Sequence, residues 1–396
     1  MSRKSFFILS VVSLLLLSCD GMDTPSAGQG VTPPAEEEKE SVLILDADTF
    51  YIKSDGISSS TFTVYLDGEV LSGGYTISKV ENGQTVAYNS DSWSSGLEGE
   101  ATFVASYQLS ESAESDGVQP VVLTSPKITI KAVPYDVPST VADPKPACLD
   151  FVRRMFLVQF TGTGCSACPG MRAALEKFLN QDGYASKSVL AAVHPKGLSL
   201  YTENDPARID IPLHVPFGLN ALPALSMNLE LCTYTAWSEE FYSVLKSRFN
   251  RQYRTPAKVG ISVNSVREGE ELMVKITVKA AETSPLRVGA WILEDGIIGP
   301  QAGTDNPAYT IHNNCVRGVQ GVVEEGEDYS GTFMGAVEKG ARAEHVFRFT
   351  IDEGWDFDKC RLVAFVTIPD AQGRKYYVNN VIACPITGQM PFEYNE

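Results

Sequence analysis

Two hydrophobic patterns, one alternating and one helical, divide the chain into three predicted folded regions. In residues 41–133 the sequence Thr-Phe-Thr-Val-Tyr at 61–65 alternates polar and apolar side chains, and Asp67-Gly68 and Asn82-Gly83 fit tight hairpin turns. An alternation with a period of two is typical of strands that bury one face. Several such strands in one short segment predict a β-sandwich.

The middle region, residues 148–254, mixes the two patterns. A nearly continuous apolar run at 155–160 predicts a buried strand. The segment after Pro169 predicts a helix, because its apolar residues recur at helical spacing, at Met171, Ala174, Leu175, Phe178 and Leu179. A β-rich run at 187–193 follows, and then a second helical segment at 238–250 with one apolar face made of Phe241, Val244, Leu245 and Phe249. Alternating strands and helices predict a central sheet covered by helices.

Residues 255–396 return to the strand pattern, and no long helical segment interrupts them. Their predicted strands lie at 259–263, 272–278, 288–293, 346–351, 362–368 and 376–382. The predicted fold class is therefore a multidomain protein, α/β plus all-β, in which one α/β domain lies between an N-terminal and a C-terminal β-sandwich. A Pro-rich stretch at 134–147 predicts a semi-rigid linker between the first two domains.

The first 40 residues have the features of an export signal and a spacer. Arg3 and Lys4 precede a short apolar stretch, which ends in Leu-Leu-Ser-Cys at 16–19 and is too short to cross a membrane. Residues 1–19 resemble a lipoprotein signal peptide with a lipobox, and this implies that Cys19 is acylated; a plain secretory signal is the alternative. Residues 20–40 are rich in Gly, Pro, Ser and Glu and predict a flexible linker. We therefore expect an exported protein that is tethered to a membrane by an N-terminal lipid anchor.

The charge of the chain excludes one class of partner. The formal net charge is −17 at pH 7, and no basic stripe appears anywhere in the sequence. Binding to nucleic acid depends largely on basic groups that displace counterions from phosphate. No nucleic-acid partner is expected.

Cys165-Ser-Ala-Cys168 lies between the predicted strand and the predicted helix of the middle region. A thiol at a helix N-terminus is more acidic than a free one, so Cys165 is expected to be the nucleophile, with its sulfur exposed to solvent and that of Cys168 buried. Three interpretations stay open. Zinc would need two further ligands, and no second Cys-x-x-Cys or paired His motif exists. The others are a structural disulfide and a redox pair, in which Cys165 attacks a substrate disulfide and Cys168 resolves the mixed disulfide.

The segment around these cysteines resembles thioredoxin-like domains. Residues 217–227 add to this likeness, because they resemble the family's strand that opens with a cis proline, which here would be Pro223. The resemblance implies that Pro223 packs against the Cys pair and that the backbone beside Ala224 binds an extended substrate. Gln159 stands where many relatives have a buried carboxylate that moves a proton, and an amide cannot titrate.

A second resemblance covers the chain from Cys148 to its end. The pattern Phe-Thr-Gly-x-x-Cys-x-x-Cys-Pro at 160–169 and the stretch at 309–317 resemble the twenty-eight-kilodalton outer-membrane-protein-related lipoproteins. This likeness implies an outer-membrane lipoprotein of the cell envelope, facing the periplasm or the cell surface. The region before it, residues 41–133, resembles a bacterial immunoglobulin-like domain and is expected to be a spacer, with an adhesion module as the alternative.

The remaining cysteines and histidines are less informative. With Cys19 set aside, the chain keeps seven cysteines, and an odd number means that at least one thiol is free or pairs with another molecule. A Cys360–Cys384 disulfide is one possibility, because the two residues flank the last predicted hairpin. Of the four histidines only His312 lies in a stretch with a family likeness.

The sequence thus leaves two functional hypotheses. In the first, the chain is a membrane-anchored lipoprotein that performs thiol–disulfide exchange on exported client proteins, or with a redox partner protein, through Cys165 and Cys168. In the second, it is a non-catalytic binding or structural lipoprotein of the outer membrane with a degenerate thioredoxin-like scaffold. Neither hypothesis requires a cofactor or a metal.

Overall fold

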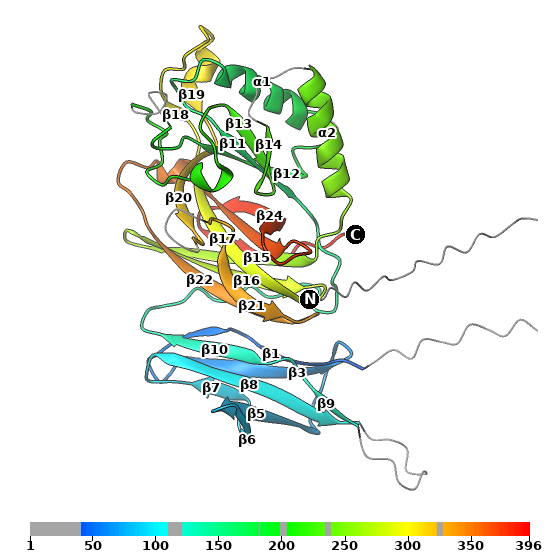
Figure 1. Ribbon diagram of the computed structural model, residues 1–396. Helices are drawn as coiled ribbons and strands as arrows, with labels where there is room; N and C mark the ends of the chain where they lie inside the picture. The colour runs from blue at the N-terminus through cyan, green and yellow to red at the C-terminus, as the bar shows by residue number, and fades with distance from the viewer. Residues whose placement is uncertain (1–40, 110–120, 182, 199–203, 234–238, 323–327) are drawn as a thin grey trace, which may run out of the picture. The chain divides into compact units, whose positions relative to one another are not determined.

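The computed structural model describes residues 41–109, 121–181, 183–198, 204–233, 239–322 and 328–396. These residues hold strands β1 to β25 and only two α-helices, so the described fold is mostly β (Figure 1). No helix among them is long and apolar enough to span a membrane. The predicted signal peptide, the predicted linker at 20–40 and Cys19 lie outside the described residues.

Strands β1 to β10 form two sheets that share one apolar core. One sheet contains β1 (Leu43–Ala47), β3 (Ser59–Leu66), β4 (Glu69–Val70) and β7 (Ser92–Ser94), and the other contains β2 (Tyr51–Lys53), β10 (Ile128–Val133), β8 (Gly99–Gln108), β5 (Tyr75–Glu81), β6 (Gln84–Ala87) and β9 (Val122–Thr124). Asp67 and Asn82 have positive φ angles and are each followed by a glycine that also has one, which confirms the two predicted hairpin turns.

A nine-stranded sheet carries the region of the cysteine pair. Its order is β14 (Glu230–Thr233), β13 (Ala224–Met227), β11 (Met155–Phe160), β12 (Ser188–Val193), β20 (Cys315–Gln320), β17 (Ser284–Glu294), β23 (Cys360–Pro369) and β24 (Tyr376–Pro385), and β21 (Thr332–Val337) also pairs with β17. Helices α1 (Cys168–Leu179) and α2 (Glu239–Tyr253) lie together on one face of β11 to β14 (Figure 1). The opposite face of these strands packs on apolar side chains of the later strands.

This sheet shows that the predicted fold class is wrong. We predicted a thioredoxin-like α/β domain as a separate body between two β-sandwiches. Instead, β11 to β14 belong to the same sheet as β17, β20, β23 and β24. The join is the parallel pairing of Ala192 with Cys315, and the amide of Ala192 donates to the carbonyl of Asn314 over 2.7 Å. Hydrogen bonds between β12 and β20 therefore make one mostly-β body out of segments that we had assigned to two domains.

The helical patterns are confirmed in part. In α1 the residues Met171, Ala174, Leu175 and Phe178 are all buried, as the spacing predicts. In α2 Leu245 and Phe249 are buried, but Val244 is 57% exposed. Val244 therefore lies outside the apolar stripe that α2 turns toward the core.

A last sheet covers the second face of the C-terminal strands. It consists of β22 (Arg342–Thr350), β16 (Glu271–Ala280), β15 (Val259–Glu268) and β25 (Gly388–Met390), and its apolar side chains share a core with β17 and β23. A short hairpin of β18 (Ile297–Ile298) and β19 (Ile311–His312) lies apart from both sheets.

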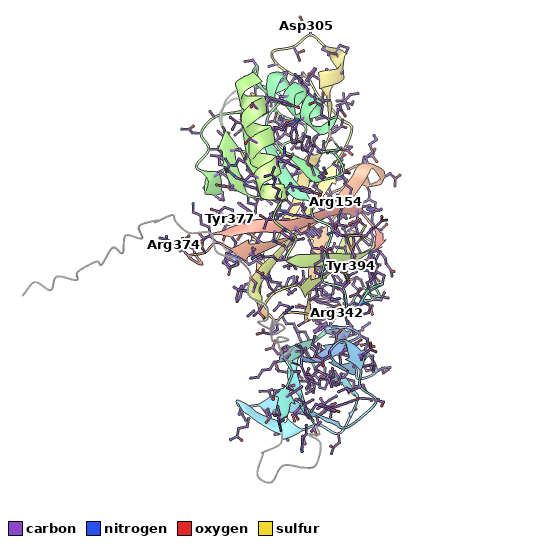
Figure 2. All side chains as sticks on the ribbon, turned by 90° about the vertical axis from the view of Figure 1, so that its right-hand side faces the viewer. Arg154, Asp305, Arg342, Arg374, Tyr377 and Tyr394 are labelled. Atoms are coloured by element: carbon purple, nitrogen blue, oxygen red, sulfur yellow. A yellow bond between two sulfur atoms is a disulfide. The ribbon has the colours of Figure 1, made fainter. Side chains whose placement is uncertain are left out.

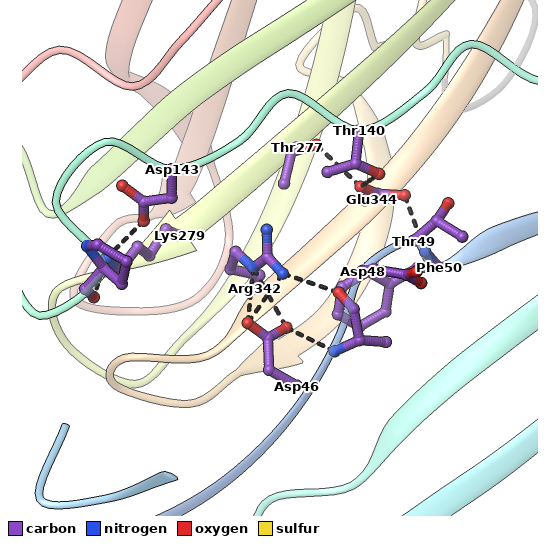
Figure 3. A network of polar contacts seen from close by, with 12 residues as sticks. Asp46, Asp48, Thr49, Phe50, Thr140, Asp143, Thr277, Lys279, Arg342 and Glu344 are labelled. Carbon is purple, nitrogen blue, oxygen red and sulfur yellow. Dashed lines mark hydrogen bonds and ion pairs between the residues drawn. The ribbon is translucent and has the colours of Figure 1, made fainter. Parts of the chain in front are cut away.

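Buried ion pairs join this sheet to the first strands and to the Pro-rich linker, as Figure 3 shows. Arg342 binds Asp46 at 2.8 Å, and Lys279 binds Asp143 at 2.9 Å. Lys275 lies 3.3 Å from Glu344, which also accepts hydrogen bonds from Thr140, Thr277 and the amide of Phe50. The contacts replace water around these charges, so neither partner can be removed without leaving the other uncompensated.

The C-terminal tail is fixed in a similar way. Arg154, which precedes β11, forms an ion pair with Glu393, and its amide donates to Asn380 over 3.0 Å. Tyr394 donates its hydroxyl proton to Asp143 over 2.7 Å. Figure 2 labels both Arg154 and Tyr394. The start of β11 is therefore held by residues from the end of the chain.

Candidate functional site

Cys165 and Cys168 form a disulfide at the start of α1. The helix begins at Cys168, after Ala167 as its N-cap, and Pro169 occupies the first turn, where no amide donor is needed. The pair thus lies at the helix N-terminus as predicted. The prediction that Cys165 faces solvent is wrong, however, because its residue is only 3% exposed and Cys168 is 1% exposed.

A segment from far along the chain covers the disulfide. The side-chain amide of Gln301 lies 3.3 Å from the carbonyl oxygens of Gly162 and Thr163 and 3.1 Å from that of Cys165. The amide of Ala302 also donates to Thr163 over 2.7 Å. Gly303 has a φ of +81°, and a Cβ atom there would lie 2.1 Å from the carbonyl oxygen of Ser166. We call residues 299–304 the covering segment.

The covering segment had no signal in the sequence analysis. Its contacts come from a glutamine amide and from a glycine that allows two backbones to touch. Neither feature forms a periodic pattern. Figure 2 shows Asp305, just beyond this segment, at the outer tip of the loop that follows it.

Pro223 and Ala224 are the predicted substrate-binding residues. The Leu222–Pro223 peptide bond is cis, as we predicted. Ala224 is fully buried and pairs with Phe160 of β11, while β14 pairs with β13 from Leu225 onward. Binding of a substrate strand beside Ala224 stays a prediction.

A buried polar cluster lies next to the disulfide turn. His194 Nδ1 is 2.8 Å from Asp205 Oδ2, and His194 Nε2 is 3.9 Å from Cys315 Sγ. The same oxygen of Asp205 accepts a hydrogen bond from the amide of Thr163 over 2.7 Å, which ties the cluster to the turn that leads into the cysteines. The sequence analysis missed this cluster because its residues come from three distant segments.

The cluster is charged. Burial alone would lower the pKa of His194, but the hydrogen bonds to Asp205 and Cys315 outweigh burial and raise that pKa to about 10. Burial raises the pKa of Asp205, but His194 and the backbone donors outweigh it, so the net shift is downward. Near neutral pH the pair is therefore an imidazolium next to a carboxylate.

A cavity of about 160 Å³ lies beside this cluster. Its polar lining includes Gln159, Arg172, His194 and His312, and Cys168 also reaches it. Its apolar lining includes Leu175, Leu179 and Leu190. Helix α1, the strands β11 and β12 and the β19 region thus each supply one wall.

Arg172 fixes one of these walls. Its Nη1 donates to the carbonyl of Ile311 over 2.9 Å, its Nε to Glu176 over 2.9 Å, and its guanidinium lies 4.9 Å from the ring centre of Tyr309. Across the cavity the rings of His312 and His194 pack edge to face, with 5.5 Å between the ring centres. Burial, together with the charge of His194, lowers the pKa of His312. His312 is therefore a neutral neighbour of a charged histidine.

No group of three or more metal-binding side chains occurs among the described residues. Within the described ranges, the five cysteines outside the disulfide are free, namely Cys148, Cys232, Cys315, Cys360 and Cys384. The possible Cys360–Cys384 disulfide does not form, because Cys384 pairs across the hairpin with Leu362 and not with Cys360. Burial raises the pKa of both thiols to about 12, so they are poor nucleophiles.

Comparison with known proteins gave one family match. The model of the family described as "Outer membrane protein Omp28" matches residues 214–387, which is less than half of the chain. No curated protein sequence matches at a significant level. No match supports an immunoglobulin-like or a thioredoxin-like domain.

Two solved structures are similar over larger parts of the chain. HBP35 of Porphyromonas gingivalis is 17% identical, with a TM-score of 0.46 over 59% of this chain and 76% of that one. A structural-genomics target from Agrobacterium tumefaciens is 16% identical, with a TM-score of 0.36 over 61% of this chain and 95% of that one. Both TM-scores are below 0.5, so neither structure supports a conclusion about this chain. The residues that match the Omp28 family include the covering segment, Pro223 and Cys315, whereas the Cys165–Cys168 disulfide precedes them.

Proposed function

We propose that this chain is an outer-membrane-associated protein with a structural or binding role, and that its Cys165–Cys168 disulfide is a structural cross-link. The description of the matching family supports the location. The covering segment supports the role of the disulfide. This proposal corresponds to the second of the two hypotheses from the sequence.

The inaccessibility of the disulfide is the observation that carries the proposal. Exchange requires a thiolate to approach one sulfur along the disulfide axis. Cys165 is 3% exposed, and the covering segment packs on the backbone of its turn, so almost none of its surface is open to a protein thiol in the native fold. In addition, Gln159 offers no group that could take up a proton from the second thiol.

Thiol–disulfide exchange is the second candidate. It is favoured by the position of the cysteines at a helix N-terminus and by the cis bond before Pro223. It would require the covering segment to leave the cysteine turn before each reaction. The two candidates therefore differ in one measurable property, the accessibility of the sulfurs in the native state.

Native-state thiol trapping tests the proposal. Cys148 and Cys232 are partly exposed, so both are first replaced by serine to remove their background. We expect the disulfide to resist a mild reductant in the folded protein and to be reduced and alkylated in denaturant. Cys168→Ser should not accumulate mixed disulfides with exported proteins. Rapid native reduction, together with trapped partners that disappear in Cys165→Ser, would show that the site is catalytic.

We further propose that acylated Cys19 tethers the protein to the membrane. The basic residues, the short apolar stretch and the Leu-Leu-Ser-Cys sequence at 16–19 support this tether. Cys19→Ala should yield an unprocessed precursor or a soluble exported protein in membrane fractionation. If the mature variant remained with the membrane to the same extent, the anchor would have to be elsewhere.

A further inference from the structure

A second cavity, of about 270 Å³, lies between the segment before β11, the end of α2 and strands β23 and β24. It shares no lining residue with the cavity beside the disulfide. We propose that it binds an organic monocarboxylate that carries an apolar group of about the size of a leucine side chain. The inference goes beyond the proposed function, because it assigns a ligand class to a cavity that neither the disulfide nor the membrane anchor involves.

Arg153 lines this cavity and differs from the other partly buried arginines of the described residues, each of which forms an ion pair with Asp or Glu. These are Arg154, Arg172, Arg208, Arg248, Arg287, Arg317, Arg342 and Arg361. Arg153 instead donates through Nη1 to the backbone carbonyls of Thr255 and Pro256. Burial lowers the pKa of Arg153, whereas the hydrogen bond to Glu393 raises that of Arg154. A guanidinium in this position favours an anion beside it, because burial has removed part of its water.

Two donors on the cavity wall are not used by the protein. Within the described ranges, no atom accepts a hydrogen bond from Nη2 of Arg153. Oδ1 of Asn379 accepts the amide protons of Lys258 over 2.9 Å and Val259 over 3.2 Å, which fixes the orientation of its side chain and leaves Nδ2 as the unused donor. Both nitrogens keep accessible surface, unlike Nε of Arg153, which is buried. Since Arg153 and Asn379 both line the cavity, a ligand there can accept from Nη2 and Nδ2.

The charges around the cavity favour a single negative charge. Of the other two charged residues in the lining, Lys258 is neutralised by an ion pair with Glu282. Glu230 is neutralised by Arg248, at 2.8 Å. One uncompensated positive charge, that of Arg153, therefore remains, in a chain whose formal net charge is −17. A carboxylate matches it with one charge and offers only acceptors, whereas a phosphate brings more negative charge than the wall neutralises.

The size and the apolar wall limit what is attached to the carboxylate. The apolar part of the wall consists of Ile368, Pro369, Val378 and the ring of Tyr377, which Figure 2 labels. A volume of about 270 Å³ corresponds to roughly nine water molecules at about 30 Å³ each. This is room for a carboxylate with a short branched chain, as in 4-methylpentanoate. A polypeptide that ends in Leu presents the same two groups.

Calorimetric titration of the full chain with 4-methylpentanoate tests the inference. At constant ionic strength we expect saturable binding, and binding of 4-methylpentanamide, which has the same shape but no charge, that is weaker by about tenfold or more. A tetrapeptide that ends in Leu with a free C-terminus is titrated in parallel with its C-terminal amide. Tighter binding of the free-acid peptide than of the small acid would identify the end of a polypeptide as the ligand. Binding of the small acid alone would identify a free acid.

Two variants remove the proposed contacts. Arg153→Gln removes the positive charge. Asn379→Asp keeps an acceptor for the amides of Lys258 and Val259 but replaces the free donor by a negatively charged oxygen. Each variant should bind the acid more weakly by about tenfold or more. Arg251→Gln is the matched control, because Arg251 is exposed on α2 and does not line the cavity, and it should bind like the wild type.

Circular dichroism shows whether each variant is folded, and Asn379→Asp keeps the test valid if Arg153→Gln does not fold. The inference is overturned if neither the small acid nor the free-acid peptide binds saturably, or if the amides bind as well as the acids. It is also overturned if a folded Arg153→Gln or Asn379→Asp protein keeps wild-type affinity.

Discussion

Replacing Gln301 by alanine is expected to expose the Cys165–Cys168 disulfide to reduction in the native protein. The side-chain amide of Gln301 is within hydrogen-bond distance of the carbonyls of Gly162, Thr163 and Cys165. Alanine removes these contacts, and since Gln301 lies outside every strand, we expect the sheets to stay intact. The covering segment should then leave the cysteine turn more often.

The size of the effect follows from the number of hydrogen bonds. An amide nitrogen carries two protons, so Gln301 makes at most two good hydrogen bonds at one time. With a net contribution of about 0.5–1.5 kcal/mol each, the variant loses about 1–3 kcal/mol of stabilisation of the closed segment. Because 1.4 kcal/mol corresponds to a factor of ten, the open population should rise roughly 5- to 150-fold. If opening and closing are fast, the rate of reduction rises by the same factor.

The assay is a time course of native reduction. Samples are taken at intervals from a mild reductant, alkylated, and digested, and the Cys165 and Cys168 peptides are quantified by mass spectrometry. Gln320→Ala is the matched control, because Gln320 donates the same kind of hydrogen bond to the carbonyl of Arg348 on another part of the surface. If Gln301→Ala and Gln320→Ala are reduced at the same rate, the covering segment does not protect the disulfide.

Three further outcomes follow from the structure. Gly303→Ala should raise the reduction rate more than Gln301→Ala does, since its Cβ would overlap a backbone oxygen at a positive φ; an unchanged rate would contradict the close packing. Lys275→Met should lower the free energy of unfolding in urea by about 3–5 kcal/mol, because it leaves Glu344 buried without its cation, and adding Glu344→Gln should recover part of the loss; a neutral single variant would refute the role of this pair. Burial lowers the pKa of His345 to about 4. The contribution of neutral His345 to the free energy of unfolding is therefore fully present above pH 6.5 and is lost as the pH falls toward 4. His345→Gln should flatten the stability curve over that interval by up to about 3 kcal/mol, measured by urea unfolding at each pH, and an unchanged slope would show that another group titrates there.

Local structure could be predicted from the sequence where a pattern repeats within one segment. The apolar spacing of α1 identified its buried residues, from Met171 to Phe178, because one face of a helix recurs every three or four positions. The turns at Asp67 and Asn82 were also found, since positive φ angles favour these residue types before glycine. The Cys pair and Pro223 were found from their spacing and from a family resemblance.

The fold class and the surroundings of the site could not be predicted in this way. The pairing of Ala192 with Cys315 joins strands from distant parts of the chain, and the local pattern of each strand is compatible with many neighbours. Asp205 and Gln301 lie in irregular segments, where contacts depend on single side chains and follow no period. Long-range pairing therefore decided both the architecture and the burial of the disulfide.

The pairing of β12 with β20 also constrains how the chain can be shortened and synthesised. Until the residues from Asn314 onward are available, Ala192 has no backbone acceptor on that side of β12. An unpaired, apolar strand edge is a template for pairing with other chains. A fragment that ends after α2 would therefore be expected to aggregate even though it contains the cysteine pair and both helices. During synthesis, the same edge stays without its partner strand while more than a hundred further residues are added, so we expect this region to be prone to wrong pairing over that interval.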